Sequence, residues 1–264
     1  MKYFISLITI ILIASCATSK NEKLYEQNLK KYTRVISSKE NDFSDYKNYS
    51  NNWISTVNFN LRKPNFVIIH HTAQNSLKQT INTFINDKTQ VSAHYIISRD
   101  GQIVQMLNDY LRAWHAGDAK WGKVTDINSV SIGIELDNNG TENFPDEQIN
   151  SLLYLLNKLK EIYNIPKQNF IAHSDIAPSR KIDPSIFFPW EKLAKKGFGV
   201  WPNQELAQVP ENFDPIFGLK MIGYDTQNSL NAIKAFKLHY LKIENSDVLD
   251  KNTILLIYNV FKLQ

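Results

Sequence analysis

Apolar and polar positions follow two different periods along this chain, which indicates that it contains both strands and helices. Short runs rich in Val and Ile, at 65–71 and 129–136, have the length and composition of buried strands. Two further β-rich runs within 92–107 flank Asp100 and Gly101, a dipeptide that favours a hairpin turn. Elsewhere apolar residues recur every three or four positions, as they do along one face of a helix.

The most regular helical pattern begins at Pro145 and Asp146 and ends near Pro166. Leucines and isoleucines line one stripe of it, and a carboxylate lies in the first turn, where it is favoured. A shorter helical pattern occupies 76–87, and another strand is expected at 169–173. Because strands alternate with helices, the sequence predicts an α/β fold with a central mixed β-sheet flanked by helices.

The C-terminal part follows a segment rich in proline and polar residues, 199–215, which indicates a linker. Amphipathic helical patterns come next, at 226–241 and 250–262. We therefore expect an α/β domain at 50–204 and a small all-helical module at 205–264, either docked on the first domain or tethered to it.

The N-terminus has the pattern of a secretory leader, with Lys2 before an apolar run and small residues before Cys16. The run is shorter than the roughly 20 apolar residues that span a bilayer. The segment Ile-Ala-Ser-Cys resembles a bacterial lipobox, in which the cysteine is lipidated. The sequence thus predicts a leader at 1–15, then at 16–49 the lipidated Cys16 and a polar tether with no clear period.

A lipid on Cys16 would anchor the chain to a membrane of the bacterial cell envelope without spanning it. Ala17 follows, and the absence of Asp there resembles the signal for the outer membrane, so we expect an anchor facing the periplasm. Cys16 is the only cysteine, so it cannot form an intramolecular disulfide. The alternative to lipidation is a free thiol buried in an N-terminal helix. The net charge of +4 is too small to indicate a nucleic-acid partner.

Histidines and a carboxylate gather where predicted strands end. His70 and His71 close one run, His173 follows another, and Asp183 precedes Pro184, which favours an extended backbone. Neighbouring residues of a strand face opposite sides, so one of the adjacent histidines should face a site, and the pattern leaves open which. Each histidine alone is readily explained as a strand-end cap. Together, two imidazoles and a carboxylate favour a catalytic zinc site with a fourth position for water.

Two further residues could share this site. Lys181 lies two positions before Asp183, on the same side if the segment is extended. Glu135 shares one face of its predicted strand with Ser131 and Gly133, where nothing bulky would keep it from a cleft. A strand glutamate is usually exposed to solvent, so this signal is weak by itself.

Five segments together resemble a known family in their order and spacing: VIIHHTA, SAHYIISRDGQIVQML, RAWHAG, NSVSIGIEL and IAHSDIAPSRKIDPSIFFPW. The family is that of the zinc-dependent N-acetylmuramoyl-L-alanine amidases, which includes the peptidoglycan recognition proteins. The resemblance extends over 50–264 and is strongest to lipoprotein members with a C-terminal helical, peptidoglycan-binding-like module. It implies one Zn²⁺ per chain and hydrolysis of the amide between N-acetylmuramic acid and L-alanine of peptidoglycan, in cell-wall turnover or recycling.

The resemblance also implies roles for particular residues. The zinc ligands would be His70 rather than His71, together with His173 and Asp183. Ser185 stands where the family often has glycine, which affects the shape of a turn and no ligand.

The implied catalytic residues are Glu135, as the base that takes a proton from water, and Lys181, which would stabilise the oxyanion. Trp114 and His115 are expected to line the groove for peptidoglycan or muropeptides. His71 and His94 are expected to be structural, and His239 to pack within the C-terminal module.

Three other functions are alternatives to amide hydrolysis. A non-catalytic peptidoglycan-binding protein is disfavoured because every ligand and catalytic position is filled. A serine hydrolase using Ser174 or Ser179 is disfavoured because the chain has no Gly-x-Ser-x-Gly segment. A metallohydrolase acting on another amide or on a phosphoester has the same ligands and stays open.

Overall fold

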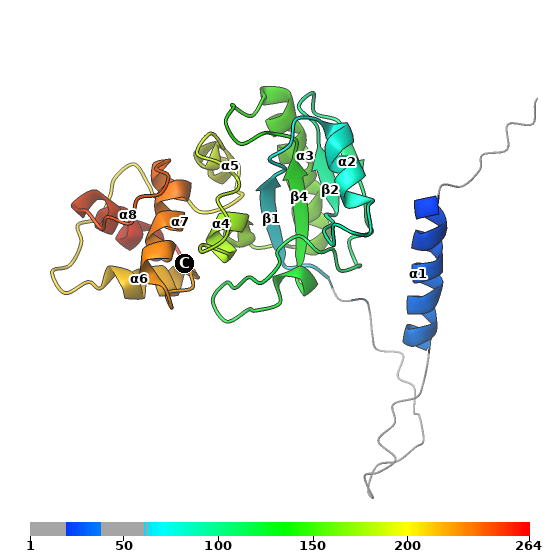
Figure 1. Ribbon diagram of the computed structural model, residues 1–264. Helices are drawn as coiled ribbons and strands as arrows, with labels where there is room; N and C mark the ends of the chain where they lie inside the picture. Colours follow the sequence, from blue (N-terminus) through cyan, green and yellow to red (C-terminus); the bar gives the residue numbers. More distant parts are fainter. Residues whose placement is uncertain (1–19, 38–60, 62) are drawn as a thin grey trace, which may run out of the picture. The chain divides into compact units, whose positions relative to one another are not determined.

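The computed structural model describes residues 20–37, 61 and 63–264 (Figure 1). The chain divides into two compact units, 1–59 and 60–264. The predicted leader at 1–15 and Cys16 lie outside the described residues, as do residues 38–49 of the predicted tether. Among the helices that are described, none combines the length and apolar character needed to cross a membrane.

Helix α1 (Lys20–Ser37) lies within the segment predicted to be a polar tether, where no helix was predicted. Lys, Glu, Gln and Leu, which have high helix propensity, make up much of the segment. None of its residues is buried. Tyr25, Leu29, Tyr32 and Ile36 recur within it at helical spacing, a signal that was missed because the segment is polar overall.

The second unit contains five strands: β1 (Phe66–His71), β2 (Tyr95–Ile97), β3 (Ile103–Gln105), β4 (Ser131–Leu136) and β5 (Phe170–Ala172). They form one mixed sheet in the order β3-β2-β4-β1-β5. β1 pairs in parallel with β4 and β5, β2 pairs in parallel with β4, and β2 and β3 form the antiparallel hairpin. Gly101 in this hairpin has φ 84°, a left-handed conformation that favours glycine. The predicted mixed sheet and hairpin are confirmed.

The two faces of the sheet contact different hydrophobic clusters. Val67 and Ile69 of β1 face the larger hydrophobic core, together with the apolar stripe of α3 (Asp146–Tyr163). Phe66 and Ile68 face the opposite side and belong to a second, smaller cluster. This alternation places His70 on the face away from α3, while α3 lies along the sheet (Figure 1).

Short helices complete the sheet domain: α2 (Leu77–Phe84), α4 (His173–Ile176) and α5 (Trp190–Lys195), with single 3₁₀ turns at Ile127–Ser129 and Lys167–Asn169. The helices predicted at 76–87 and from Asp146 onwards are confirmed. Ser76 caps α2 by accepting a hydrogen bond from the backbone N–H of Gln79 at 3.2 Å.

Three C-terminal helices form a hydrophobic cluster of their own: α6 (Pro215–Ile222), α7 (Ser229–Leu241) and α8 (Lys251–Phe261). Helix α6 was not predicted, since its first residue was assigned to the linker. Its signals were the cap residue Asp214, which accepts from the N–H of Ile216 at 2.8 Å, Pro215 at the first helical position, and Gly223 after the end.

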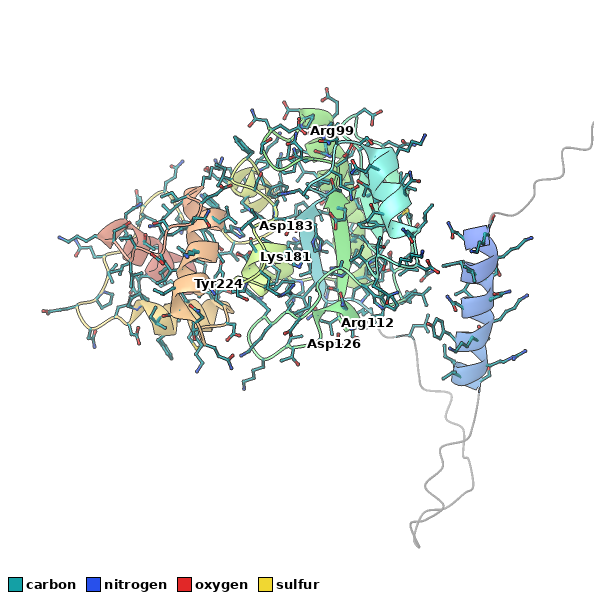
Figure 2. The ribbon with its side chains drawn as sticks, viewed as in Figure 1. Arg99, Arg112, Asp126, Lys181, Asp183 and Tyr224 are labelled. Atoms are coloured by element: carbon teal, nitrogen blue, oxygen red, sulfur yellow. The ribbon has the colours of Figure 1, made fainter. Side chains whose placement is uncertain are left out.

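A buried carboxylate joins α7 to α4. Asp175 accepts the hydroxyl of Tyr224 at 2.7 Å, the backbone N–H of Ala172 at 2.9 Å, and Nδ1–H of His239 at 2.7 Å. The ring of His239 also stacks on Trp190 at 4.1 Å. His239 therefore packs, as predicted, and in addition holds the C-terminal helices next to the start of α4 (Figure 2, where Tyr224 is labelled).

We predict that Asp175→Ala lowers the free energy of unfolding by about 3–5 kcal/mol, because it leaves three buried donors without their acceptor. Urea unfolding of the full chain measures this change. Asp146→Ala is the control, since Asp146 pairs with Lys192 at the surface and is 82% exposed. We expect it to change the free energy of unfolding by less than about 1 kcal/mol. Equal effects of the two substitutions would contradict the role given to Asp175.

Candidate metal centre

Three side-chain atoms from distant parts of the chain converge at the carboxyl ends of the parallel strands. Nδ1 of His70 lies 2.9 Å from Nδ1 of His173, and Oδ2 of Asp183 lies 3.1 and 3.0 Å from these two nitrogens. All three residues are buried. Their geometry makes them a group that could hold a metal ion.

Each of the three residues has a separate structural support. His70 lies near the end of β1, and His173 is the first residue of α4, directly after β5. Asp183 is tied back to the same helix, because its backbone carbonyl accepts the N–H of Ser174 at 2.9 Å. Figure 2 labels Asp183 and Lys181 in this region.

The chemistry of the three atoms fits a cation. Nε2 of His173 lies 3.2 Å from the carbonyl oxygen of Ala116, which can only accept, so this nitrogen carries the proton. Nδ1 of His173 therefore faces Asp183 and His70. Two imidazole nitrogens and a carboxylate oxygen that converge within 3.1 Å are typical metal ligands.

The protonation states support this assignment. Burial lowers the pKa of His70 to about 4, with the charge of His173 acting in the same direction and Asp183 opposing it. Burial alone would raise the pKa of Asp183, but hydrogen bonds and charge from His173 and His70 outweigh it and hold that pKa below its ordinary value. At neutral pH the site therefore offers a neutral His70 and an anionic Asp183.

Glu135 lies beside this group on the neighbouring strand. It is the register partner of His70 in the parallel pair of β4 and β1, so both side chains point to the same face. Its Oε2 is buried and has no hydrogen-bond partner among the described residues. Burial raises the pKa of Glu135 to about 8, the charge of Asp183 adds to this rise, and Lys181 opposes it. Glu135 has the properties of a base placed close to neutral pH.

One cleft of about 560 Å³ is lined by all the residues of the sheet domain that were predicted to bind metal, catalyse the reaction or bind substrate. Its lining includes the metal-ligand candidates His70, His173 and Asp183, the catalytic candidates Glu135 and Lys181, and the groove candidates Trp114 and His115. Trp114 is 48% exposed, whereas His115 is buried.

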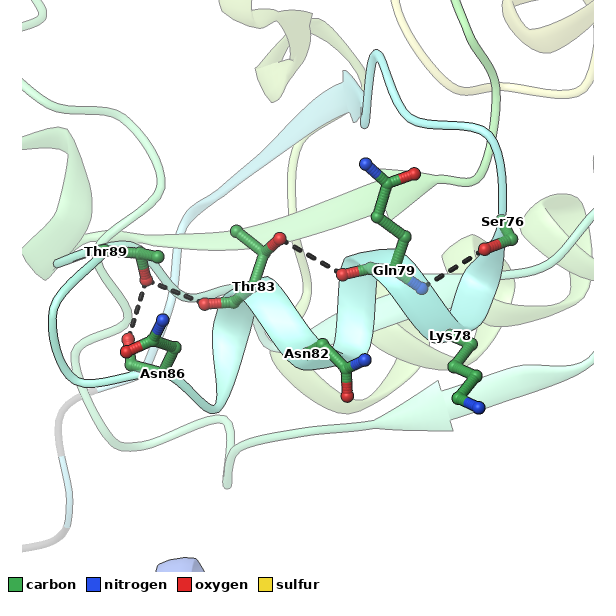
Figure 3. Close-up of a pocket in the computed structure, with 7 residues that line it drawn as sticks. All are labelled: Ser76, Lys78, Gln79, Asn82, Thr83, Asn86 and Thr89. Carbon is green, nitrogen blue, oxygen red and sulfur yellow. Dashed lines mark hydrogen bonds between the residues drawn. The ribbon is translucent and has the colours of Figure 1, made fainter.

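A second hollow lies along α2 and has a different character (Figure 3). Lys78 is the one titratable residue in its lining. Ser76 caps the helix there, while the Thr83 hydroxyl donates to the Gln79 carbonyl at 3.1 Å and the Thr89 hydroxyl donates to the Thr83 carbonyl at 2.7 Å. Because these polar groups serve the helix backbone, the cleft at the metal-ligand candidates is the candidate active site.

The two histidines expected to be structural make hydrogen bonds to the backbone. Nδ1 of His71 accepts the N–H of Ser185 at 3.1 Å, two residues after Asp183. Nδ1 of His94 accepts the N–H of Gly133 at 3.1 Å, and its Nε2 donates to the carbonyl of Leu111 at 2.9 Å. His71 thus steadies the turn that carries Asp183.

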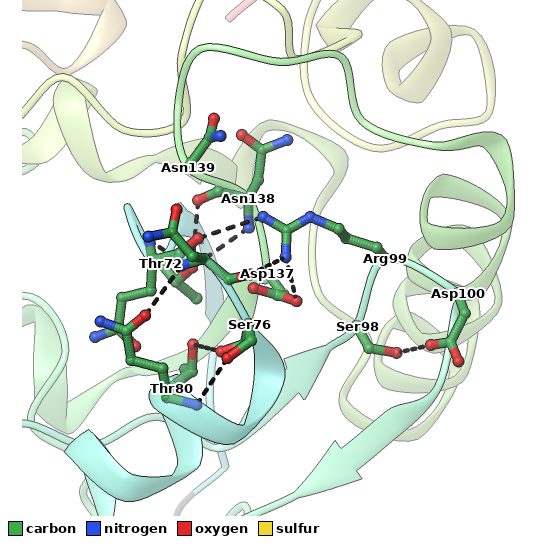
Figure 4. Close-up of polar contacts among 12 residues, drawn as sticks. Thr72, Ser76, Thr80, Ser98, Arg99, Asp100, Asp137, Asn138 and Asn139 are labelled. Carbon is green, nitrogen blue, oxygen red and sulfur yellow. Dashed lines mark hydrogen bonds and ion pairs between the residues drawn. The ribbon is translucent and has the colours of Figure 1, made fainter.

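The rim of the cleft is held by an arginine that the sequence did not single out. Arg99 donates to Asp137 and Glu142, in each case at 2.8 Å, and to the backbone carbonyls of Gln74 and Asn75. It therefore ties the loop after β1 to the loop after β4 (Figure 4). Its position just before the hairpin turn gave no signal, because the acidic partners are about 40 residues away in sequence.

Fold and site define an α/β protein with a His–His–Asp centre in a cleft at the carboxyl edge of a mixed sheet. A family model described as N-acetylmuramoyl-L-alanine amidase matches residues 60–186. The chain is 37% identical to the N-acetylmuramoyl-L-alanine amidase AmiD of Escherichia coli K12 over 206 residues, 66% of this chain and 74% of that protein. It is 42% identical over 104 residues to the 1,6-anhydro-N-acetylmuramyl-L-alanine amidase AmpD of Haemophilus influenzae, 39% of this chain and 56% of that protein.

Solved structures agree with these sequence comparisons. The structure of E. coli AmiD in complex with the substrate anhydro-N-acetylmuramic acid-L-Ala-D-gamma-Glu-L-Lys matches with a TM-score of 0.69 at 28% identity, over 79% of this chain and 93% of that one. AmpDh3 from Pseudomonas aeruginosa shares the fold, with a TM-score of 0.70 at 24% identity over 83% and 97% of the two chains. The chain belongs to the N-acetylmuramoyl-L-alanine amidase family.

We predict that Glu135→Gln stabilises the metal-free chain at alkaline pH. The folded-state pKa of about 8 lies above the ordinary value of 4.5, so the wild type loses stability as pH rises through this window, and the uncharged amide does not. The stability advantage of the variant should therefore be small near pH 4, grow towards pH 8 and then level off. Urea unfolding at a series of pH values, with chelator present, measures it. A difference in the free energy of unfolding between variant and wild type that does not change with pH would contradict the raised pKa of Glu135.

Proposed function

We propose that this chain hydrolyses the amide bond between N-acetylmuramic acid and L-alanine of peptidoglycan stem peptides, with one Zn²⁺ held by His70, His173 and Asp183. The observation that carries the proposal is the convergence of their three ligand atoms within 3.1 Å, beside the unpartnered, buried carboxylate oxygen of Glu135. Family membership supports the reaction, because the related AmiD and AmpD are named as amidases of this bond.

Zinc bound by this group would polarise the amide carbonyl and make a water molecule more acidic. Glu135 takes the proton of the attacking water and then delivers it to the leaving amine of L-alanine. Its raised pKa, about 8 without the metal, suits a group that must both accept and release a proton. Lys181, which lines the same cleft, stabilises the negative charge that develops on the carbonyl oxygen.

The cleft also suits a muropeptide. Trp114 is half exposed at its edge and offers an aromatic face for a sugar ring or the peptide. His115 lies in the floor of the same cleft, and both of its ring nitrogens are already within hydrogen-bond distance of other side chains. The AmiD complex holds an anhydromuramyl tripeptide, which supports muropeptides as ligands here. A non-catalytic binding protein would not need Glu135 and Lys181 beside a complete ligand set.

We also propose that a lipid on Cys16 anchors the chain in the cell envelope, on the periplasmic face of the outer membrane. The lipobox-like sequence before Cys16 and the Ala17 that follows it support this location. An anchored amidase in that position would act in cell-wall turnover or recycling.

Incubation of the full chain with a muramyl peptide, analysed by mass spectrometry, tests the reaction. We predict release of a free peptide that begins with L-alanine, its loss on addition of a chelator, and its recovery with Zn²⁺. Absence of cleavage by the chain with stoichiometric zinc bound would favour the binding-only role. A phosphoester offered in parallel identifies a different hydrolase.

Two variants separate metal binding from catalysis. We expect Asp183→Ala to lose both zinc and activity. Glu135→Gln should retain zinc while its turnover falls by about 10²–10⁴-fold, the usual contribution of general acid–base catalysis. Zinc content by mass spectrometry and turnover are measured on the same preparations. Normal turnover in Glu135→Gln would show that the base has been assigned wrongly.

Fractionation of bacterial cells tests the anchor. We expect the wild-type chain in the outer-membrane fraction and Cys16→Ala outside it, because the variant lacks the thiol that accepts the lipid. Identical distributions of the two chains would contradict an anchor on Cys16.

A further inference from the structure

His115 lies at the centre of a buried chain of polar side chains behind the metal-ligand group. Its Nδ1 is 3.1 Å from Nε2 of His70, and its Nε2 is 3.1 Å from the hydroxyl oxygen of Ser131. All three residues are buried, and the contact to His70 is on the ring nitrogen that faces away from Asp183 and His173.

The direction of these hydrogen bonds is fixed from one end. The carbonyl oxygen of Ile127 can only accept, so the hydroxyl of Ser131 donates its one hydrogen bond to that oxygen, at 2.6 Å. The Ser131 oxygen must then accept a hydrogen bond from Nε2–H of His115. The ring of His115 is buried and has His70 and Ser131, but no carboxylate, as its hydrogen-bond partners among the described residues. With its one proton on Nε2, Nδ1 is left as an acceptor. His70 therefore donates from Nε2–H, and its Nδ1 keeps a free lone pair.

The ring of His115 is tightly packed on one side. A Cβ atom at Gly133 would come within 2.4 Å of Cγ of His115, so the ring lies directly on the backbone of β4. The side-chain oxygen of Asn128 accepts the backbone N–H of both His115 and Ala116, at 3.1 and 2.9 Å. Ser131, Gly133 and Glu135 occupy one face of β4. On this face Ser131 bonds to His115, Gly133 leaves space for its ring, and Glu135 is the proposed base.

The next residue holds the second ligand in the same way. The carbonyl of Ala116 accepts Nε2–H of His173 at 3.2 Å, which directs Nδ1 toward Asp183. Both imidazoles of the group are thus oriented through Nε2 by two consecutive residues. Outer hydrogen bonds of this kind fix the tautomer and the orientation of a metal-bound histidine.

We infer that His115 is a positioning residue, which holds His70 in the Nε2–H tautomer with Nδ1 ready for the metal, and that Ala116 does the same for His173 through its backbone. This inference rests on the metal site proposed above and adds a function for the RAWHAG segment. It separates the two residues of that segment, since Trp114 faces the cleft while His115 acts through His70.

The test compares His115→Phe with His115→Asn in the full chain. Phenylalanine removes the acceptor for His70, whereas the side-chain oxygen of asparagine replaces Nδ1 as an acceptor. In the metal-free wild type, ¹⁵N NMR of the imidazoles should give His70 as the Nε2–H tautomer, and His115→Phe should abolish this preference. Zinc affinity, measured by competition with a chromophoric chelator, should fall by about 10–100-fold in His115→Phe and should be largely restored in His115→Asn.

His94→Phe is the matched control. His94 is as buried as His115, its ring lies 6.0 Å away, and its hydrogen bonds are to the backbone of Gly133 and Leu111. We expect His94→Phe to lower stability while the His70 tautomer and zinc affinity stay as in the wild type. An unchanged tautomer and affinity in His115→Phe would overturn the inference, as would equal losses of affinity in His94→Phe and His115→Phe.

The outcome is independent of the amidase assay. The NMR measurement uses neither metal nor substrate, so a chain with the expected tautomers that cleaves no muramyl peptide would contradict the proposed function and leave the positioning role intact. A chain that cleaves the peptide while His115→Phe leaves the tautomer unchanged would contradict the positioning role alone.

Discussion

The convergence of three side-chain atoms from distant parts of the chain is the constraint on which the rest of this site depends. Nδ1 of His70, Nδ1 of His173 and Oδ2 of Asp183 lie within 3.1 Å of one another, close enough to share one cation. The chain maintains it because each residue is fixed from behind. β1 carries His70 inside a parallel sheet, α4 begins at His173, and the backbone carbonyl of Asp183 is bonded to that helix. The larger core on the opposite face supplies the apolar burial that keeps this scaffold rigid.

Strand β4 organises the polar side of the sheet by the simple alternation of its residues. Ile132, Ile134 and Leu136 face the core. Ser131, Gly133 and Glu135 share the opposite face. Ser131 bonds to the His115 ring, Gly133 leaves space for it, and Glu135 lines the cleft with a carboxylate whose pKa is raised. The C-terminal helices reach the same region from another direction, since Asp175 bonds both to His239 on α7 and to the backbone of Ala172, next to His173. The metal-ligand candidate on α4 and the helical module therefore share one buried polar contact.

The sequence was sufficient for the sheet, for the long helix α3, and for the residues that meet in the cleft. Strand periodicity predicted the faces of β1 and β4, and the quoted motifs singled out His70, His173, Asp183, Glu135 and Lys181. It was insufficient where an apolar period was not the dominant signal. Helix α1 has no buried stripe, and α6 is marked by its cap, by Pro215 and by Gly223 rather than by polarity. The roles of Ser131, Arg99 and Asp175 could not be predicted from the sequence, because each depends on partners that only the folded chain brings close.

The most direct measurement of the central claim is the position of bound zinc in crystals of the full chain. Anomalous difference maps from data collected above and below the zinc absorption edge locate the ion without reference to any activity. We predict one peak per chain, enclosed by Nδ1 of His70, Nδ1 of His173 and Oδ2 of Asp183. A zinc-saturated crystal with no peak among these three atoms, or with its ordered zinc held elsewhere in the chain, would contradict it.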